Sequence, residues 1–258
     1  MHRLALLLAF ACCIQAAQAA PAAPLRVILV GDSTMATRTG YGDALCARFD
    51  PAVTCINLAR GGRSSASFRA EGRWDEVQTL LRESASYQAS YVLIQFGHND
   101  QPGKPGRSTD LVKEYPHNMA RFGDEVRALS GVPVLVTPLT RRSFDGPWLH
   151  DDLAPWSAAM RRVAKEGKFN LLDLNAISAA AVQAMGSAEA DTLAAAPPPG
   201  PGAAPVLPVP AVAEPNGTPK SVFDRTHLGA KGAALFSAMV ATELARIRPE
   251  LAATLRTR

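Results

Sequence analysis

The sequence predicts an α/β fold in which a parallel β-sheet carries helices on both of its faces. Five short runs rich in Val, Ile and Leu have the composition of buried strands. Longer amphipathic stretches separate these runs, and such alternation is typical of parallel sheets because their strands need crossover connections. The length of 258 residues, with 47% hydrophobic and 19% charged residues, fits one globular domain.

Each element follows from the pattern in chain order. The predicted strands cover residues 26–30, 53–58, 91–96, 132–137 and 170–174. The predicted helices cover residues 41–48, 73–83, 114–129, 154–166, 176–185 and 230–247. In sheets of this kind, ligands bind beyond the carboxyl ends of the strands. We therefore expect the functional residues where the predicted strands end.

The N-terminus has the pattern of a signal peptide. Residues 1–3 supply a short positive region, residues 4–14 form an unbroken apolar run, and residues 17–19 offer a small-residue cleavage site. The apolar run is short for a bilayer span, and no later run reaches the roughly 18 residues that a span needs. We expect residues 1–19 to be removed, residues 20–258 to form one domain, and the mature chain to be secreted or periplasmic.

The four cysteines fall into two pairs. Cys12 and Cys13 suggest a lipoprotein, but the residues before them match a lipidation signal poorly. Cys46 and Cys55 remain after cleavage, and they could close a short loop as a disulfide. Two buried free thiols explain the pair equally well.

Charge and low-complexity sequence add two expectations. The net charge of +4 suits a polyanionic polymer such as a pectin or an acidic cell surface. The basic residues are scattered, so the sequence gives no indication of nucleic-acid binding. Residues 194–219 are rich in Ala and Pro, which excludes a helix or an interior strand. We expect an exposed inserted loop there, with a lid that contacts substrate as the alternative.

The first predicted strand runs directly into Gly31-Asp32-Ser33. This order places a serine hydroxyl at the carboxyl end of a buried strand, where Gly31 permits a tight turn. The backbone N–H of Ser33 would begin the next segment and could donate to an oxyanion. The motif is weak by itself, because Gly-Asp-Ser is also an ordinary turn and helix-cap sequence.

A candidate base lies near the end of the chain, where Asp224 precedes His227 by three residues. A serine hydroxyl needs a base within hydrogen-bonding reach near neutral pH. That base in turn needs an acceptor to fix its tautomer and stabilise its charged form. Asp224 and His227 can supply both functions on one loop, although a surface ion pair also explains the spacing.

Two further loops offer hydrogen-bond donors. Gly61 and Gly62 follow the second predicted strand and let backbone amides approach a ligand closely. Residues 97–100 follow the third predicted strand, and Asn99 among them carries a side-chain amide. The N–H groups of Ser33 and Gly62, together with the Asn99 amide, would form a three-donor oxyanion hole.

The order of these motifs resembles the SGNH hydrolases, also called GDSL hydrolases. The matching blocks are Gly31-Asp32-Ser33, Gly62, Gly97-x-Asn99-Asp100 and Asp224-x-x-His227. The resemblance covers essentially the whole mature chain and implies a three-layer α/β/α fold with a five-stranded, flavodoxin-like parallel sheet. It also implies that Ser33 is the nucleophile, that Asp224 and His227 complete the triad, and that Ser33, Gly62 and Asn99 form the oxyanion hole.

Segments 31–36, 62–65, 96–100 and 137–144 resemble the rhamnogalacturonan acetylesterases in particular. That resemblance implies a serine esterase that removes acetyl groups from O-acetylated pectic sugars through an acyl-enzyme, without a metal or other cofactor. The Pro-rich insertion before Asp224 departs from the pattern and leaves the polysaccharide open. The alternatives are a general carbohydrate acetylesterase, acting on acetylated xylan or oligosaccharides, and a lipolytic GDSL esterase.

Four polar residues near these motifs are candidate substrate contacts. His98 could orient Asn99 or line the site, with a structural role as the alternative, and Asp100 follows in the same motif. Arg141 and Arg142 could pair with a galacturonate carboxylate, but a structural ion pair explains them equally well. The tryptophans are candidate sugar-stacking platforms, with core packing as the default: Trp74, Trp148 and Trp156.

Three other classes of protein fit parts of the pattern. An α/β-hydrolase needs Gly-x-Ser-x-Gly, and residues 62–66 lack the last glycine. A non-catalytic carbohydrate-binding protein would need no nucleophile, and turnover of an acetyl ester would exclude it. A metallophosphoesterase would be sensitive to chelators, but no early Asp-x-His or late Gly-His-x-His completes its ligand set. That ligand set would draw on Asp32, His98, Asp100, Asp224 and His227.

Overall fold

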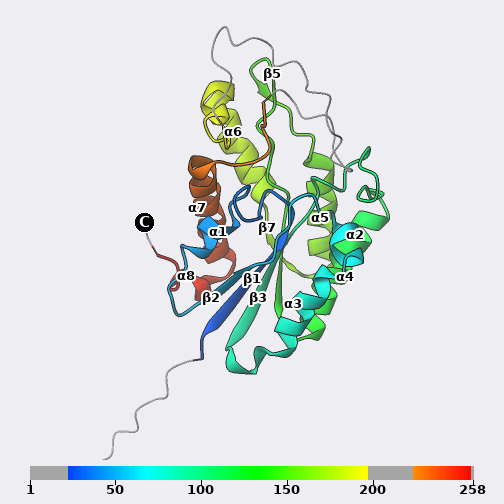
Figure 1. Cartoon of the computed structure of the whole chain (residues 1–258), viewed down its shortest axis with the longest axis vertical. Coiled ribbons are helices and arrows are strands. Elements are labelled where there is room, and N and C mark those ends of the chain that lie inside the picture. Colours follow the sequence, from blue (N-terminus) through cyan, green and yellow to red (C-terminus); the bar gives the residue numbers. More distant parts are fainter. Residues whose placement is uncertain (1–22, 197–222, 257–258) are drawn as a thin grey trace, which may run out of the picture.

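Runs of branched aliphatic residues form a five-stranded parallel sheet in the order β2-β1-β3-β4-β7 (Figure 1). The strands are β1 (Leu25–Gly31), β2 (Thr54–Asn57), β3 (Ala89–Gln95), β4 (Val132–Val136) and β7 (Asn170–Leu172). Strands β1, β3 and β4 are buried on both faces, which explains their continuous apolar sequences. All five predicted strands are present, with bounds shifted by at most two residues.

The structure, a computed structural model, describes residues 23–196 and 223–256. The expected signal peptide, residues 1–19, lies outside the described residues. Most of the Ala/Pro-rich segment 194–219 lies outside them as well. Within the described part, no helix is both long and apolar enough to cross a membrane.

Helices cover both faces of the sheet. One layer contains α1 (Gly42–Cys46), α6 (Leu174–Asp191), α7 (Ala230–Ile247) and α8 (Pro249–Ala252). The other contains α2 (Ser65–Ala70), α3 (Arg73–Arg82), α4 (Glu114–Ala128) and α5 (Ala154–Gly167). Alternate residues of β1 pack on the two layers, with Val27 and Leu29 on the first and Ile28 and Val30 on the second. The predicted three-layer α/β/α fold is confirmed.

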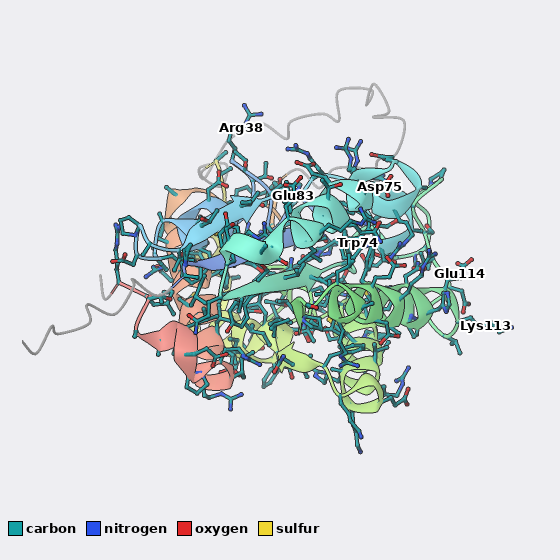
Figure 2. The ribbon with its side chains drawn as sticks, turned by 90° about the horizontal axis from the view of Figure 1, so that it is seen from below. Arg38, Trp74, Asp75, Glu83, Lys113 and Glu114 are labelled. Carbon is teal, nitrogen blue, oxygen red and sulfur yellow. A yellow bond between two sulfur atoms is a disulfide. The ribbon has the colours of Figure 1, made fainter. Side chains whose placement is uncertain are left out.

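The tryptophans divide between core and surface. Trp74 of α3 is buried, packs edge-on against Phe122 at 4.5 Å, and donates its indole N–H to Glu125. Figure 2 shows Trp74 turned inward, whereas Arg38 projects from the edge of the molecule. Trp156 is also buried, whereas Trp148 is 71% exposed. Core packing therefore describes two of the three tryptophans.

Several short elements escaped prediction. They are α2, α8, the 3-10 helix Ser84–Ser86, and a hairpin of β5 (Phe144–Asp145) and β6 (Trp148–Leu149). Helix α2 begins with a capping box in which Ser64 and Ser67 each accept the backbone N–H of the other. Elements this short have too few residues to show a hydrophobic period.

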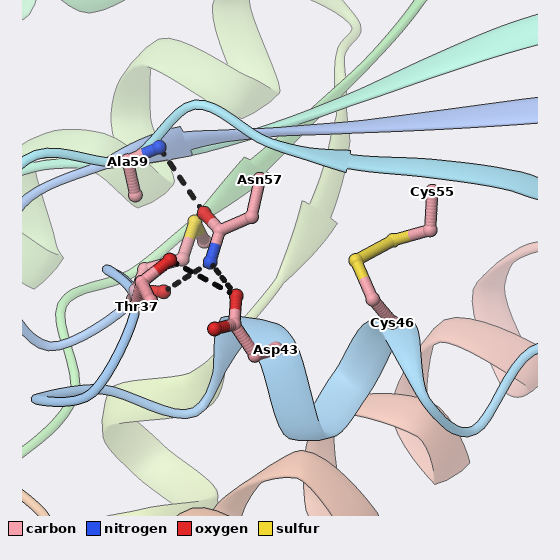
Figure 3. Close-up of a disulfide and its surroundings, with 7 residues drawn as sticks. Thr37, Asp43, Cys46, Cys55, Asn57 and Ala59 are labelled. Atoms are coloured by element: carbon pink, nitrogen blue, oxygen red, sulfur yellow. Dashed lines mark hydrogen bonds between the residues drawn. A yellow bond between two sulfur atoms is a disulfide. The ribbon is translucent and has the colours of Figure 1, made fainter.

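Cys46 and Cys55 form a disulfide between α1 and β2 (Figure 3). Close by, the side-chain amide of Asn57 donates to the Met35 carbonyl at 3.1 Å and to Asp43 Oδ1 at 2.7 Å. These contacts connect the end of β2 to the segment that follows β1. The disulfide settles the alternative that the sequence left open for the pair.

The strand order brings the loops after β1, β2 and β3 together. The chain leaves β1 for β2 on one side and then returns to β3 on the other side of β1. Loops diverge at such a switch point and leave room for a ligand at the carboxyl edge. Ser33, Gly62 and Asn99 follow these three strands in turn.

Candidate active site

Three side chains predicted from separate motifs lie in one hydrogen-bonded line. Ser33 Oγ is 2.8 Å from Nε2 of His227, and Nδ1 of the same ring is 2.7 Å from Asp224 Oδ2. A carboxylate at Nδ1 requires that nitrogen to donate, so Nε2 is free to accept the serine proton. Ser33 and His227 are 194 residues apart in sequence, so only the fold brings them together.

Asp224 uses both of its carboxylate oxygens locally. Oδ1 accepts the backbone N–H groups of Thr226 and His227, each at 2.9 Å, while Oδ2 accepts the His227 ring. Burial alone would raise the pKa of Asp224, but these hydrogen bonds lower it well below its usual value. Asp224 is therefore ionised at neutral pH. Its side chain is 54% exposed, and contact with water also favours the charged form.

Arg142 holds the loop that carries Asp224 and His227. Its Nη2 donates to the backbone carbonyls of His227 at 2.7 Å and Asp224 at 3.1 Å, and its backbone N–H donates to the Arg225 carbonyl. Burial lowers the pKa of Arg142 to about 10, so the side chain is still a cation at neutral pH. Because the residue is completely buried, the structural alternative for Arg142 fits its position better than contact with a substrate.

Arg141 contacts the same loop from a partly buried position. Its guanidinium donates to Asp152 Oδ2 at 3.0 Å, to Thr226 Oγ1 at 2.7 Å and to Gln101 Oε1 at 2.7 Å. Its nitrogens Nε, Nη1 and Nη2 each have a protein partner. A pairing of Arg141 with a substrate carboxylate stays a prediction, and it would compete with Asp152.

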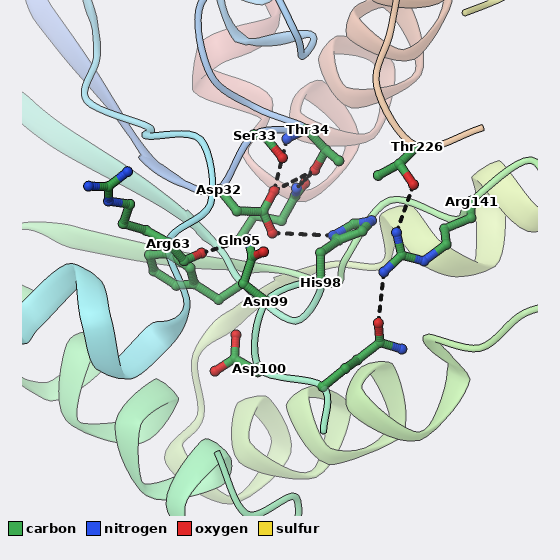
Figure 4. A network of polar contacts seen from close by, with 12 residues as sticks. Asp32, Ser33, Thr34, Arg63, Gln95, His98, Asn99, Asp100, Arg141 and Thr226 are labelled. Carbon is green, nitrogen blue, oxygen red and sulfur yellow. Dashed lines mark hydrogen bonds and ion pairs between the residues drawn. The ribbon is translucent and has the colours of Figure 1, made fainter. Parts of the chain in front are cut away.

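A buried polar network lies beneath the nucleophile turn (Figure 4). Asp32 Oδ1 accepts both the backbone N–H and the hydroxyl of Thr34, at 2.9 and 2.8 Å. Tyr41 donates to Gln95, which in turn donates to Thr34. Asp32 Oδ2 is 3.2 Å from Nδ1 of His98. This network fixes the turn that presents the Ser33 hydroxyl.

His98 belongs to this buried network. The residue is 2% exposed and lies against Asp32, and burial lowers its pKa although Asp32 opposes the shift. Burial alone would raise the pKa of Asp32, but the pairing with His98 and the hydrogen bonds from Thr34 together outweigh burial, and the pKa lies below its ordinary value. The structural alternative for His98 therefore fits its position better than contact with a substrate.

The candidate oxyanion donors come from the loops that follow three neighbouring strands. Within the described residues, the backbone N–H groups of Ser33 and Gly62 have no hydrogen-bond partner. Asn99 Nδ2 donates one hydrogen to the Arg63 carbonyl at 3.1 Å, which leaves its second hydrogen available. A Cβ added at Gly61 would lie 3.7 Å from the Ser33 Cβ, so the loop after β2 passes beside the nucleophile.

Asp100 anchors the adjacent loops. The buried carboxylate accepts from the backbone N–H of Ser65 at 3.1 Å and from the hydroxyls of Ser65 and Thr109. Burial raises the pKa of Asp100 to about 7. Because the residue has no exposed surface, its position fits attachment of α2 and the loop after β3 better than contact with a substrate.

The five side chains considered for a metal centre are divided between separate contacts. Asp32 pairs with His98, Asp224 pairs with His227, and Asp100 binds Ser65 and Thr109. Among the described residues, no three His, Cys, Asp or Glu side chains are grouped so that they could hold a metal ion.

A profile of known proteins matches residues 29–235 and is described as the GDSL-like lipase/acylhydrolase family. The chain belongs to this family. Membership confirms the resemblance to SGNH hydrolases and makes the protein a carboxylic ester hydrolase. The matched region begins within β1 and ends inside α7, so it contains every residue of the candidate site.

Known proteins from Bacillus subtilis match the chain in sequence. The chain is 34% identical over 178 residues to rhamnogalacturonan acetylesterase RhgT of Bacillus subtilis, covering 66% of this chain and 73% of that protein. It is 29% identical over 155 residues to the probable rhamnogalacturonan acetylesterase YesY of the same organism. That match covers 57% of this chain and 69% of YesY.

Solved structures share the fold. The crystal structure of YxiM from Bacillus subtilis superposes with a TM-score of 0.65 at 21% identity, covering 88% of this chain and 57% of that longer chain. Axe2, an acetylxylan esterase from Geobacillus stearothermophilus, gives a TM-score of 0.58 at 17% identity. That match covers 90% of this chain and 97% of the Axe2 chain. These likenesses confirm the fold class.

Some residues around the site were not predicted. Thr39 donates its hydroxyl to the Ser33 carbonyl at 2.8 Å, and Arg107 donates to the Gly62 carbonyl at 2.9 Å. Asp32 stood inside the recognised motif but had no role in the predicted esterase site. Thr39 and Arg107 lie in loops without a motif, so no sequence signal indicated them.

Proposed function

We propose that the protein is an exported serine esterase that removes O-acetyl groups from carbohydrate, with acetylated rhamnogalacturonan as its preferred substrate. The observation that carries the ester chemistry is the alignment of Ser33, His227 and Asp224 at 2.8 and 2.7 Å. A hydroxyl, an imidazole and an ionised carboxylate in this order can generate a nucleophile at neutral pH.

The proposed reaction has two halves. Ser33 Oγ attacks the acetyl carbonyl while its proton passes to His227 Nε2, and the resulting oxyanion accepts hydrogen bonds from Ser33 N–H, Gly62 N–H and Asn99 Nδ2. The bond to the sugar oxygen then breaks, and His227 returns the proton to that oxygen. Water, activated by His227, cleaves the acetyl-Ser33 ester and releases acetate.

Support for an acetylated carbohydrate comes from the relatives. Two of the Bacillus subtilis proteins that match over more than half of the chain are named as a rhamnogalacturonan acetylesterase and a probable one. The segments that resembled this subgroup include the ones that hold Ser33, Gly62 and Asn99.

One observation favours a general carbohydrate acetylesterase as the second candidate. Arg142 is buried against backbone carbonyls, and Arg141 is paired with Asp152. The two arginines considered for a galacturonate carboxylate therefore already have protein partners. A preference for pectin would have to come from other cations around the site.

We also propose that the protein acts outside the cytoplasm. The N-terminal 19 residues have the pattern of a secretory leader, and Cys46 and Cys55 are paired. Disulfides persist in oxidising compartments, which agrees with export. Cell fractionation with N-terminal sequencing of the mature protein tests this proposal, and a cytoplasmic protein that retains Met1 would contradict it.

Acetate release from matched polymers tests the substrate. The mature protein is assayed on acetylated rhamnogalacturonan and on acetylated xylan of equal acetyl content, with Ser33→Ala as the control. We expect faster release from rhamnogalacturonan and none above background from the variant. Equal rates on both polymers would support the general acetylesterase, and hydrolysis of long-chain lipid esters alone would support a lipolytic enzyme.

A further inference from the structure

A single arginine connects two of the three loops around Ser33. Arg107 lies in the loop between β3 and α4, and its Nη1 donates to the Gly62 carbonyl at 2.9 Å. The same nitrogen makes a longer contact of 3.4 Å with Oδ1 of Asn99. Nη1 carries two hydrogens, so it can serve both acceptors at once. The residues that it joins are the second and third candidate oxyanion donors.

The contact with Asn99 determines which end of the side-chain amide faces the substrate. Oδ1 faces the guanidinium of Arg107, and Nδ2 donates to the Arg63 carbonyl at 3.1 Å. A flipped amide would place its NH₂ group against the cation and its oxygen against the carbonyl. Both contacts would then be repulsive, so the two partners hold Nδ2 in the donor position.

The charge of Arg107 also strengthens the Asn99 donor. An arginine side chain carries a positive charge near neutral pH. A cation at the amide oxygen withdraws electron density from the amide, and hydrogen bonds polarised in a chain reinforce one another. The remaining N–H of Asn99 therefore becomes a better donor to a developing negative charge.

Gly62 shows how closely Arg107 packs against the hole. Its φ of +78° lies in the left-handed region, and an added Cβ would meet Arg107 Nη1 at 3.1 Å. The guanidinium therefore lies against the α-carbon of Gly62 as well as its carbonyl. Arg63 supports the same turn by donating to the Gly61 carbonyl at 2.8 Å, which belongs to the peptide that carries the Gly62 N–H.

We propose that Arg107 is a positioning residue of the oxyanion hole: it orients and polarises the Asn99 amide and fixes Gly62 beside it. Arg107 acts through these donors and need not touch the substrate. The inference rests on the proposed function in one respect, which is that Asn99 and Gly62 stabilise an oxyanion during ester hydrolysis.

Steady-state kinetics on p-nitrophenyl acetate test this role. Arg107→Ala should lower kcat by about 10-fold or more, with KM changed by less than about threefold, because an oxyanion forms only in the transition state. Arg107→Lys keeps the charge, but its ammonium is on a shorter side chain than Nη1, so it should recover only part of the loss. Arg60→Gln is the matched control, because Arg60 lies on the same loop as Gly62 and its side chain makes no hydrogen bond or ion pair among the described residues.

A double variant separates positioning from general damage to the fold. In the Asn99→Ala background, Arg107→Ala should cost at least threefold less in kcat than it does in the wild type, because its main target is already absent. If Arg107→Ala lowers kcat by the same factor in the Asn99→Ala background as in the wild type, the proposal is overturned. A kcat within twofold of wild type for the single Arg107→Ala variant would overturn it as well.

The same p-nitrophenyl acetate assay, run on Ser33→Ala, distinguishes failure of this inference from failure of the proposed function. If the wild type hydrolyses the ester and Ser33→Ala does not, the serine mechanism stands and only the role of Arg107 is in question. If Ser33→Ala is as active as the wild type, the proposed function itself fails. Arg107→Lys is used for both comparisons if Arg107→Ala does not fold.

Discussion

The buried guanidinium of Arg142 donates a 2.7 Å hydrogen bond to the backbone carbonyl of His227. The same nitrogen reaches the Asp224 carbonyl at 3.1 Å, so one side chain from the loop after β4 holds both ends of the Asp-x-x-His segment. The imidazole is thus placed over Ser33 through its own backbone. Arg141 adds a second attachment through Thr226.

Arg142→Met should weaken both activity and stability. The substitution keeps much of the buried volume but leaves the carbonyls of Asp224 and His227 without their donor, which costs about 2–4 kcal/mol of unfolding free energy. We expect kcat to fall at least about 10-fold as the loop loosens. Unfolding in guanidinium chloride measures the loss of stability. Ester kinetics under conditions in which the variant is still folded measure the loss of activity. Arg246→Met, which removes an exposed pair with Glu243, is the control, and an Arg142 variant that behaves like it would contradict the assigned role.

Asp224→Asn should lower kcat by about 10⁴-fold while the fold is retained. The amide cannot stabilise an imidazolium, and it favours the wrong tautomer of His227. Circular dichroism and a pH–rate profile accompany the kinetics. Retention of more than a tenth of the wild-type rate would mean that Asp224 does not complete the triad.

Asn99→Ala should lower kcat by roughly 10²- to 10³-fold. Its Nδ2 serves a charge that develops only in the transition state, so KM should change little. The measurement is the separation of kcat from KM on a soluble acetyl ester. A defect confined to KM would instead identify Asn99 as a ground-state contact.

Asp100 should make the protein less stable as the pH rises from about 4 to 7. Burial raises its pKa in the folded state to about 7 from an ordinary value of 3.8, so the folded protein binds the proton more tightly. This contribution is complete below pH 4 and is lost through pH 7, by up to about 1.4 kcal/mol per pH unit. Chemical unfolding of the wild type and of Asp100→Asn between pH 4.5 and 7.5 isolates it. Parallel pH dependences for the two proteins would count against a raised pKa.

The strands and the main site motifs could be predicted because they share one signal. Ser33 and Asn99 each follow a continuous apolar run, and buried parallel strands produce such runs regardless of their neighbours. The position of a motif after a strand then determines the edge of the sheet at which it lies.

Roles that depend on packing could not be predicted in the same way. Arg142 and Asp100 are polar residues beside functional motifs, and only the folded chain shows that both are buried. Arg107 contacts Gly62 across 45 residues of sequence, so its role depends on how two loops meet. Short elements such as α2 depend on capping contacts and not on hydrophobic period.

Covalent labelling tests the central claim most directly. The mature protein is treated with a fluorophosphonate that reacts with activated serines, and the labelled site is located by peptide mass spectrometry. Our account predicts one label per chain, on Ser33, with no label on Ser33→Ala and labelling at least about 10³-fold slower for His227→Ala. A label on another serine, or an unchanged labelling rate in His227→Ala, would contradict the assignment of Ser33 and His227 as nucleophile and base.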